Sequence, residues 1–123
     1  MILIGQYDSP FVRRVAIALR LYGLSFEHRP WSTFGDGEKI APYNPLRRVP
    51  TLVLGSGEVL IESTAILDYL DDLIGPEDAM IAARGPERRR DAARHPALAA
   101  HAARCEALPV FQEIVQPLAP PSA

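Results

Sequence analysis

The chain has 123 residues, of which 48% are hydrophobic and 23% charged, with a formal net charge of −2. This length suits one domain with at most an appendage, and the composition excludes wholesale disorder. The slightly acidic balance argues against a nucleic-acid-binding protein. The single cysteine, Cys105, excludes an intramolecular disulfide and a CxxC redox pair, which favours a reducing compartment. No apolar run approaches the roughly 20 residues of a membrane span, so we expect a cytoplasmic protein without membrane contact.

The first part of the chain predicts a strand, a helix and a second strand. Residues 1–6 form a short apolar run that suits a strand buried on both faces. A helix is expected from Pro10, a favourable residue at a first helical position, to the stop signal at Gly23. Residues 25–29 follow as the second strand, which completes a βαβ unit.

The next segment predicts a loop followed by a β-hairpin. Residues 33–44 contain two glycines and a proline, so we expect a loop with at most one irregular helical turn. Trp31 and Phe34 flank its beginning and either wall a pocket or cover the sheet. Residues 48–54 and 58–61 predict two strands, because a tight Gly-Ser-Gly connection joins them.

A second amphipathic helix follows the hairpin. Ser63 is a good N-cap for it, and Gly75 with the following proline ends it. Asp68, Asp71 and Asp72 are most simply a solvated face of this helix. The resulting order, βαβ, loop and ββα, predicts an α/β fold with helices on both sides of a small mixed sheet.

The composition changes after this helix, which divides the chain into two expected parts. Residues 1–75 form the α/β domain, and residues 76–123 form a linker and a short helical C-terminal segment. An arginine-rich stretch, 84–94, is best explained as a solvated helix face. A further helical pattern begins at His95, and Pro109 must kink or restart it.

Three short segments are expected to meet at one edge of the sheet, where α/β proteins commonly bind ligands. They are the turn after the first strand, the Val49–Pro50 junction and the beginning of the helix at Ser63. A helix N-terminus with a hydroxyl can bind a carboxylate, and Glu62 beside it can hold an ammonium group. A zwitterionic amino-acid end would fit both residues, although capping alone also accounts for Ser63.

The other two segments each have two interpretations. A cis bond before Pro50 would turn the backbone of Val49 outward to pair with an extended peptide, whereas a trans proline would begin an edge strand. The Ser9 hydroxyl can donate to an anionic sulfur, or it can only cap the first helix. Tyr7 can donate instead, or it packs in the interior. The three histidines lack partners at metal-ligand spacing, so we expect no metal site.

Three motifs in this order resemble the N-terminal domain of cytosolic-type glutathione S-transferases. They are Tyr7-Asp8-Ser9-Pro10-Phe11-Val12-Arg13-Arg14, Asn44-Pro45-Leu46-Arg47-Arg48-Val49-Pro50-Thr51-Leu52 and Leu60-Ile61-Glu62-Ser63-Thr64-Ala65-Ile66. The resemblance covers about residues 1–75. It implies a thioredoxin-like domain with a mixed four-stranded sheet and glutathione as co-substrate.

The resemblance also implies roles for the candidate residues. The Val49–Pro50 bond is then cis, and the backbone of Val49 pairs with the cysteinyl part of glutathione. Glu62 and Ser63 hold the γ-glutamyl end. Ser9 stands where serine-type members stabilise the thiolate of glutathione.

The function implied is conjugation of the glutathione thiolate to a small electrophile. Family members carry an all-helical second domain, whereas this chain resembles a member shortened internally near Arg94–His95. A non-catalytic glutathione-binding or protein-interaction module is therefore the alternative. A glutaredoxin-like reductase is disfavoured because no cysteine lies near Ser9. The shortening would expose apolar surface on the first and third helices, so we expect the short tail to fold back or a homodimer to form, and we predict the homodimer.

Overall fold

The structure is a computed structural model that describes residues 1–80 and 105–114. The arginine-rich stretch, most of the helical pattern from His95 and the proposed junction at Arg94 lie outside the described residues. The elements in chain order are β1 (Ile2–Ile4), α1 (Pro10–Leu21), β2 (Glu27–Arg29), α2 (Gly37–Ile40), β3 (Thr51–Val53), β4 (Val59–Ile61), α3 (Ser63–Ile74) and α5 (Pro109–Glu113).

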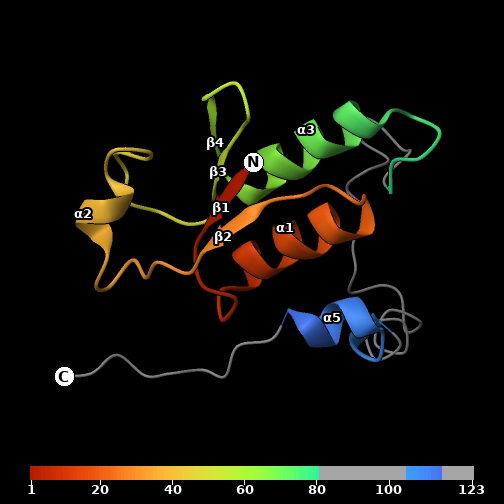
Figure 1. Cartoon of the computed structure of the whole chain (residues 1–123), viewed down its shortest axis with the longest axis horizontal. Helices are drawn as coiled ribbons and strands as arrows, with labels where there is room; N and C mark the ends of the chain where they lie inside the picture. The colour runs from red at the N-terminus through yellow and green to blue at the C-terminus, as the bar shows by residue number, and fades with distance from the viewer. Residues whose placement is uncertain (81–104, 115–123) are drawn as a thin grey trace, which may run out of the picture.

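The strands form one mixed sheet in the order β2-β1-β3-β4 (Figure 1). β1 is parallel to β2 and antiparallel to β3, and β3 is antiparallel to β4. Side chains alternate between the two faces, so Leu3 packs in the cluster under α1 and α3 while Ile4 packs in the cluster near α2. Both residues are fully buried, which confirms a first strand covered on both faces. The expected fold is therefore confirmed.

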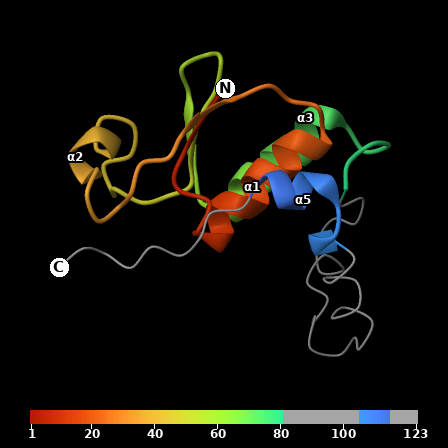
Figure 2. The same ribbon diagram turned by 60° about the horizontal axis from the view of Figure 1, so that its bottom comes forward.

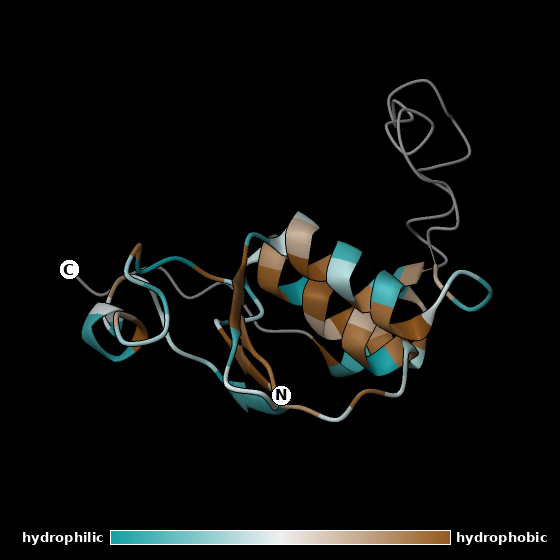
Figure 3. Ribbon diagram, turned by 90° about the horizontal axis from the view of Figure 1, so that it is seen from above, coloured by the Kyte–Doolittle hydropathy of each residue, from teal (hydrophilic) through white to brown (hydrophobic). Residues whose placement is uncertain are grey.

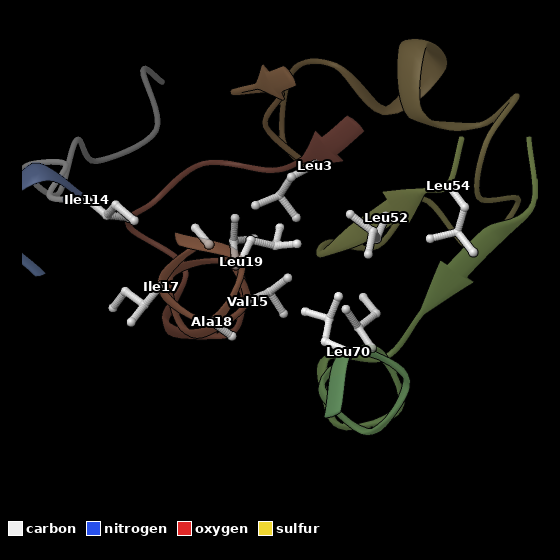
Figure 4. Close-up of a cluster of buried hydrophobic side chains, with 12 residues drawn as sticks. Leu3, Val15, Ile17, Ala18, Leu19, Leu52, Leu54, Leu70 and Ile114 are labelled. Atoms are coloured by element: carbon white, nitrogen blue, oxygen red, sulfur yellow. The ribbon is translucent and has the colours of Figure 1, made fainter. Parts of the chain in front are cut away.

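The larger core lies between the sheet and two helices (Figure 4). It joins Leu3 and Leu52 of the sheet to Val15 and Leu19 of α1 and Leu70 of α3. The central strands are strongly hydrophobic in Figure 3, whereas α2 at the far side is mainly hydrophilic. The helix predicted from Pro10 is confirmed, and Val12, Val15 and Leu19 face this core, whereas Phe11 is exposed.

Two predicted details are wrong, and both concern α3. Ser63 is the first helical residue, and Glu62 holds the N-cap position with a φ of +67°, so the helix begins at Ser63 without a side-chain cap. Asp71 is not solvated: it is only 6% exposed and accepts a hydrogen bond from the Tyr22 hydroxyl. That hydroxyl also accepts from the backbone N–H of Met80, so it ties the end of α1 to the chain that leaves α3.

The C-terminal part of the described chain folds back on α1 (Figures 1 and 2). α5 begins at Pro109, which confirms that this proline restarts a helix. Arg13 donates from Nε to the Ile114 carbonyl oxygen at 3.0 Å and from Nη2 to the Glu106 carboxylate at 2.7 Å. Ile114 is 2% exposed and joins the main core, so α1 lies between α3 and α5. None of the helices among residues 1–80 and 105–114 is long and apolar enough to cross a membrane.

Candidate functional site

One open cavity, of about 570 Å³, lies at the edge of the sheet where β1 ends and α1 and α3 begin. It brings together all five residues predicted for the site. They are Ser9, Val49, Pro50, Glu62 and Ser63. The convergence expected from the strand order is therefore found in the structure.

Ser9 stands between β1 and α1 as the N-cap residue. Its backbone is extended, Pro10 follows at the first helical position, and its hydroxyl oxygen accepts from the Val12 backbone N–H at 3.4 Å. A hydroxyl has one hydrogen to donate besides its acceptor lone pairs. Because the cap uses only a lone pair, capping and donation to a ligand in the cavity are compatible.

Gly5 allows the end of β1 to approach the other parts of the site. It has a φ of +133°, and a Cβ at this position would lie 2.5 Å from Val12 Cγ2 and 2.9 Å from Val49 Cβ. Only glycine fits such a conformation and such a gap. The residue thus sets the spacing between α1, which carries Ser9, and the segment that carries Val49.

The Val49–Pro50 peptide bond is cis. Asn44, 1% exposed, shapes the loop before it, because Asn44 Nδ2 donates to the Arg48 carbonyl at 3.0 Å and to Thr51 Oγ1 at 3.1 Å. Within residues 1–80 and 105–114 the backbone N–H and C=O of Val49 have no hydrogen-bond partner. Such groups beside a cavity can pair with the backbone of an extended peptide.

Arg14 is a site residue that the sequence analysis did not single out. Its guanidinium extends from α1 to the beginning of α3, where it donates to the hydroxyl of Ser63 and, at 3.0 Å, to Thr64 Oγ1. Ser63 is 5% exposed, so Arg14 brings a positive charge to a nearly buried hydroxyl at a helix N-terminus. The cation and the helix dipole both favour a carboxylate there. Its adjacency to Arg13 masked this role, since helical spacing alone does not tell which arginine faces α3.

Tyr7 is not among the residues that line this cavity. Its ring stacks on His28 with centroids 4.0 Å apart, and both residues line a second cavity of about 400 Å³ beside α5. Burial raises the pKa of the Tyr7 hydroxyl, and the nearby Arg20 charge opposes this only in part. Tyr7 therefore remains a neutral phenol at and above neutral pH.

Exposed apolar side chains form the rim of the main cavity. Phe11 is 56% exposed, Phe34 85% and Leu46 63%, and Trp31 lines the same cavity. Trp31 and Phe34 therefore both wall the pocket, and Trp31 also covers the sheet, because it packs on the cluster that contains Ile4. Among the described residues no three His, Cys, Asp or Glu side chains gather where they could hold a metal ion.

The parallel β1–β2 pair on one side of the sheet, the antiparallel β3–β4 hairpin on the other and a cis proline at the cavity define a thioredoxin-like domain. The comparison with known families makes the assignment specific. Residues 3–78, more than half of the chain, match the model described as the N-terminal domain of glutathione S-transferase. The chain belongs to the glutathione S-transferase family.

Individual relatives agree with this family. The Escherichia coli protein named uncharacterized GST-like protein YibF is 38% identical over 71 residues, which cover 58% of this chain and 35% of that protein. Maleylacetoacetate isomerase of Pseudomonas aeruginosa is 39% identical over 88 residues, covering 68% and 41%. The solved structure of rice GST1 (OsGSTU1) in complex with glutathione has a TM-score of 0.53 at 37% identity, covering 58% of this chain and 32% of that one. The chain thus spans less than half the length of each relative.

Proposed function

We propose that this chain binds glutathione in the main cavity and transfers its thiolate to a small electrophile. The observation that carries the proposal is the meeting of Ser9, Val49 and Ser63 at one cavity. The glutathione complex of the rice relative supports the choice of ligand.

The γ-glutamyl end of glutathione is proposed to lie at the beginning of α3. Its carboxylate would accept from Ser63 and from the Arg14 guanidinium, and its ammonium group would pair with Glu62. The cysteinyl part would pair with the backbone of Val49 as an added strand does. This orientation directs the thiol toward Ser9.

The opposite end of the tripeptide carries the glycyl carboxylate. Arg48 lines the cavity beside Val49 and would supply a cation for this group. The apolar rim formed by Phe11, Phe34 and Leu46 would contact the electrophile. An aromatic or otherwise apolar electrophile fits such a rim best.

In the reaction the thiol loses its proton to solvent, and the sulfur forms a bond to the electrophilic carbon while the leaving group departs with its electron pair. Ser9 acts by donating a hydrogen bond to the thiolate, and the N-terminus of α1 adds its dipole. This lowers the pKa of the bound thiol without a general base.

We further propose that the protein is cytoplasmic and forms a homodimer. The one cysteine of the chain leaves no internal disulfide to form, which supports a cytoplasmic setting. Leu21, Leu73 and Met80 are each about half exposed, which supports a homodimer. The alternative is a glutathione-binding or protein-interaction module without turnover, because the chain spans only part of its relatives.

A glutathione titration of the isotope-labelled chain, followed by amide NMR, tests the binding step. We expect saturable shifts at Ser9, Val49 and Ser63 and none at Gly57 in the distant hairpin turn. A dispersed spectrum that does not respond to millimolar glutathione would contradict the proposal. A conjugation assay with a generic aromatic electrophile then separates the transferase from the alternative, for which binding occurs without turnover.

A further inference from the structure

A cluster of aromatic and charged side chains lies on the face of the sheet opposite to α1, beside α2. Arg29 of β2 is its centre. Its Nη1 donates to the Tyr43 hydroxyl at 2.8 Å, and its Nε donates to the Glu27 carboxylate at 2.6 Å. Arg29 Cζ lies 5.3 Å from the ring centroid of Trp31 and 5.7 Å from that of Tyr43. These distances are those of cation–π contacts.

The two aromatic residues stand on either side of α2 along the chain. Trp31 precedes α2 and Tyr43 follows it, and their ring centroids are 6.1 Å apart with a tilt of 47°. Arg29 therefore joins both ends of the segment 31–43 to the edge strand of the sheet. Between them, Ile40 is fully buried in the small cluster with Ile4.

The same segment forms the outer wall of the main cavity. Trp31 and residues 32–34 line that cavity, and so does Asn44, which follows Tyr43 directly. Arg29 itself does not line it. The guanidinium thus lies behind the wall and contacts the residues that carry it.

We propose that Arg29 is a positioning residue for glutathione. It lies behind the cavity wall and contacts both Trp31 and Tyr43. These contacts, called the clasp below, hold the segment 31–43 in its ligand-binding position. The inference rests on the proposed function. A wall that is already ordered spares the ligand the cost of ordering it. Without the clasp, only a fraction of molecules has the wall in place, and the apparent dissociation constant rises by the inverse of that fraction.

The chemistry of the clasp requires an arginine. A planar guanidinium can contact two aromatic rings while it donates in its own plane to Tyr43 and Glu27, whereas a lysine ammonium is a point charge that cannot do both. The hydrogen bonds with Glu27 and Tyr43 raise the pKa of Arg29, and the bond from Arg29 lowers the pKa of Glu27. Both groups therefore keep their charges at neutral pH.

The experiment uses the full chain and compares Arg29→Ala, Arg29→Lys and Tyr43→Phe with the wild type. Arg47→Ala is the matched control, because it removes the same charge from the loop after α2. In the wild type, Arg47 pairs with Glu38 at 2.9 Å and does not line the cavity. Two quantities are measured. One is the glutathione dissociation constant by calorimetry, and the other is acrylamide quenching of Trp31, the only tryptophan, without ligand.

We expect Arg29→Ala to weaken glutathione binding roughly tenfold and to increase the quenching of Trp31. Arg29→Lys and Tyr43→Phe should have smaller effects in the same direction, and the control variant should match the wild type. In a turnover assay Arg29→Ala should raise KM for glutathione and leave kcat at saturation unchanged.

Wild-type affinity together with wild-type quenching in Arg29→Ala would overturn the inference. If that variant does not fold, Arg29→Lys and Tyr43→Phe decide in its place, and wild-type values in both would overturn it. A wild-type chain that does not bind glutathione would refute the proposed function. In that case a rise in Trp31 quenching on loss of Arg29 would still support the clasp, and its absence would refute it.

Discussion

At the scale of single residues, the site depends on a few side chains that serve the fold and the ligand together. Ser9 caps α1 with its lone pair and retains its hydrogen for a ligand. Ser63 is the first residue of α3, and its hydroxyl oxygen accepts a hydrogen bond from the Arg14 guanidinium. Gly5 has no side chain at all, and the site requires that absence.

We predict that Ser9→Ala raises the pKa of bound glutathione and lowers kcat by about 100-fold to 1,000-fold, the usual effect of losing one donor to a developing anion. The affinity for glutathione should change much less, because the γ-glutamyl contacts remain. The thiolate absorbance measured against pH gives the pKa directly. Tyr7→Phe is the control, and an equal loss in that variant would transfer the role to Tyr7.

Gly5→Ala should destabilise the domain by about 3 kcal/mol and abolish glutathione binding, because the new Cβ would overlap Val12 and Val49. Gly57→Ala is the matched control: its φ is also positive, at +87°, but nothing lies within 4 Å. That variant should lose only about 1 kcal/mol, the cost of the left-handed backbone. Urea denaturation of both measures the difference, and equal losses would show that the close approach is unimportant.

At the scale of elements, the sequence predicted the helix ends that neighbouring residues determine and missed the contacts between residues far apart in the chain. Pro10 and Gly23 bracketed the first helix, and Pro109 marked the beginning of α5. Ser63 was predicted as an N-cap, but Glu62 takes a positive φ and shifts the cap by one residue. The burial of Asp71 was not predictable, because its partner Tyr22 lies 49 residues earlier and only the packing of α1 on α3 brings the two together.

Part of the candidate site could be predicted from local signals. The order of strands and helices along the chain and the helix starts predicted that Ser9, Val49 and Ser63 lie at one edge of the sheet. Arg14 was missed because its contact with Ser63 depends on how α1 is rotated against α3. No period in the sequence reports that rotation.

The docking of α5 gives a prediction at this scale. Ile114→Ala should lower the free energy of unfolding by about 2–4 kcal/mol, since it empties a buried position in the main core. Glu113→Gln removes only the exposed ion pair with Arg20, 3.1 Å long, and should cost under about 1 kcal/mol. Urea unfolding compares the two variants. If Ile114→Ala unfolds at the wild-type midpoint, α5 contributes nothing to the core in solution.

At the scale of the whole molecule, residues 105–114 cover only part of the apolar surface of α1 and α3. α5 packs on α1, while Leu73 on α3 remains 49% exposed. The expectation that the tail folds back is thus met for residues 105–114. Apolar side chains on the uncovered side still favour association.

We predict a homodimer at tens of micromolar, measured by sedimentation velocity. Leu73→Gln should shift the chain toward monomer, because it removes exposed apolar surface from α3 and leaves the core unchanged. A wild-type chain that sediments as a monomer throughout this range would contradict the prediction.

The place of Ile114 in the core has a consequence for synthesis on the ribosome. Leu3 and Ile114 belong to the same buried cluster, so the chain cannot complete that cluster until residue 114 has left the exit tunnel. Until then the side of α1 that faces α5 is open to water and to other nascent chains. We therefore expect the growing chain to be a client of ribosome-associated chaperones until residue 114 has emerged.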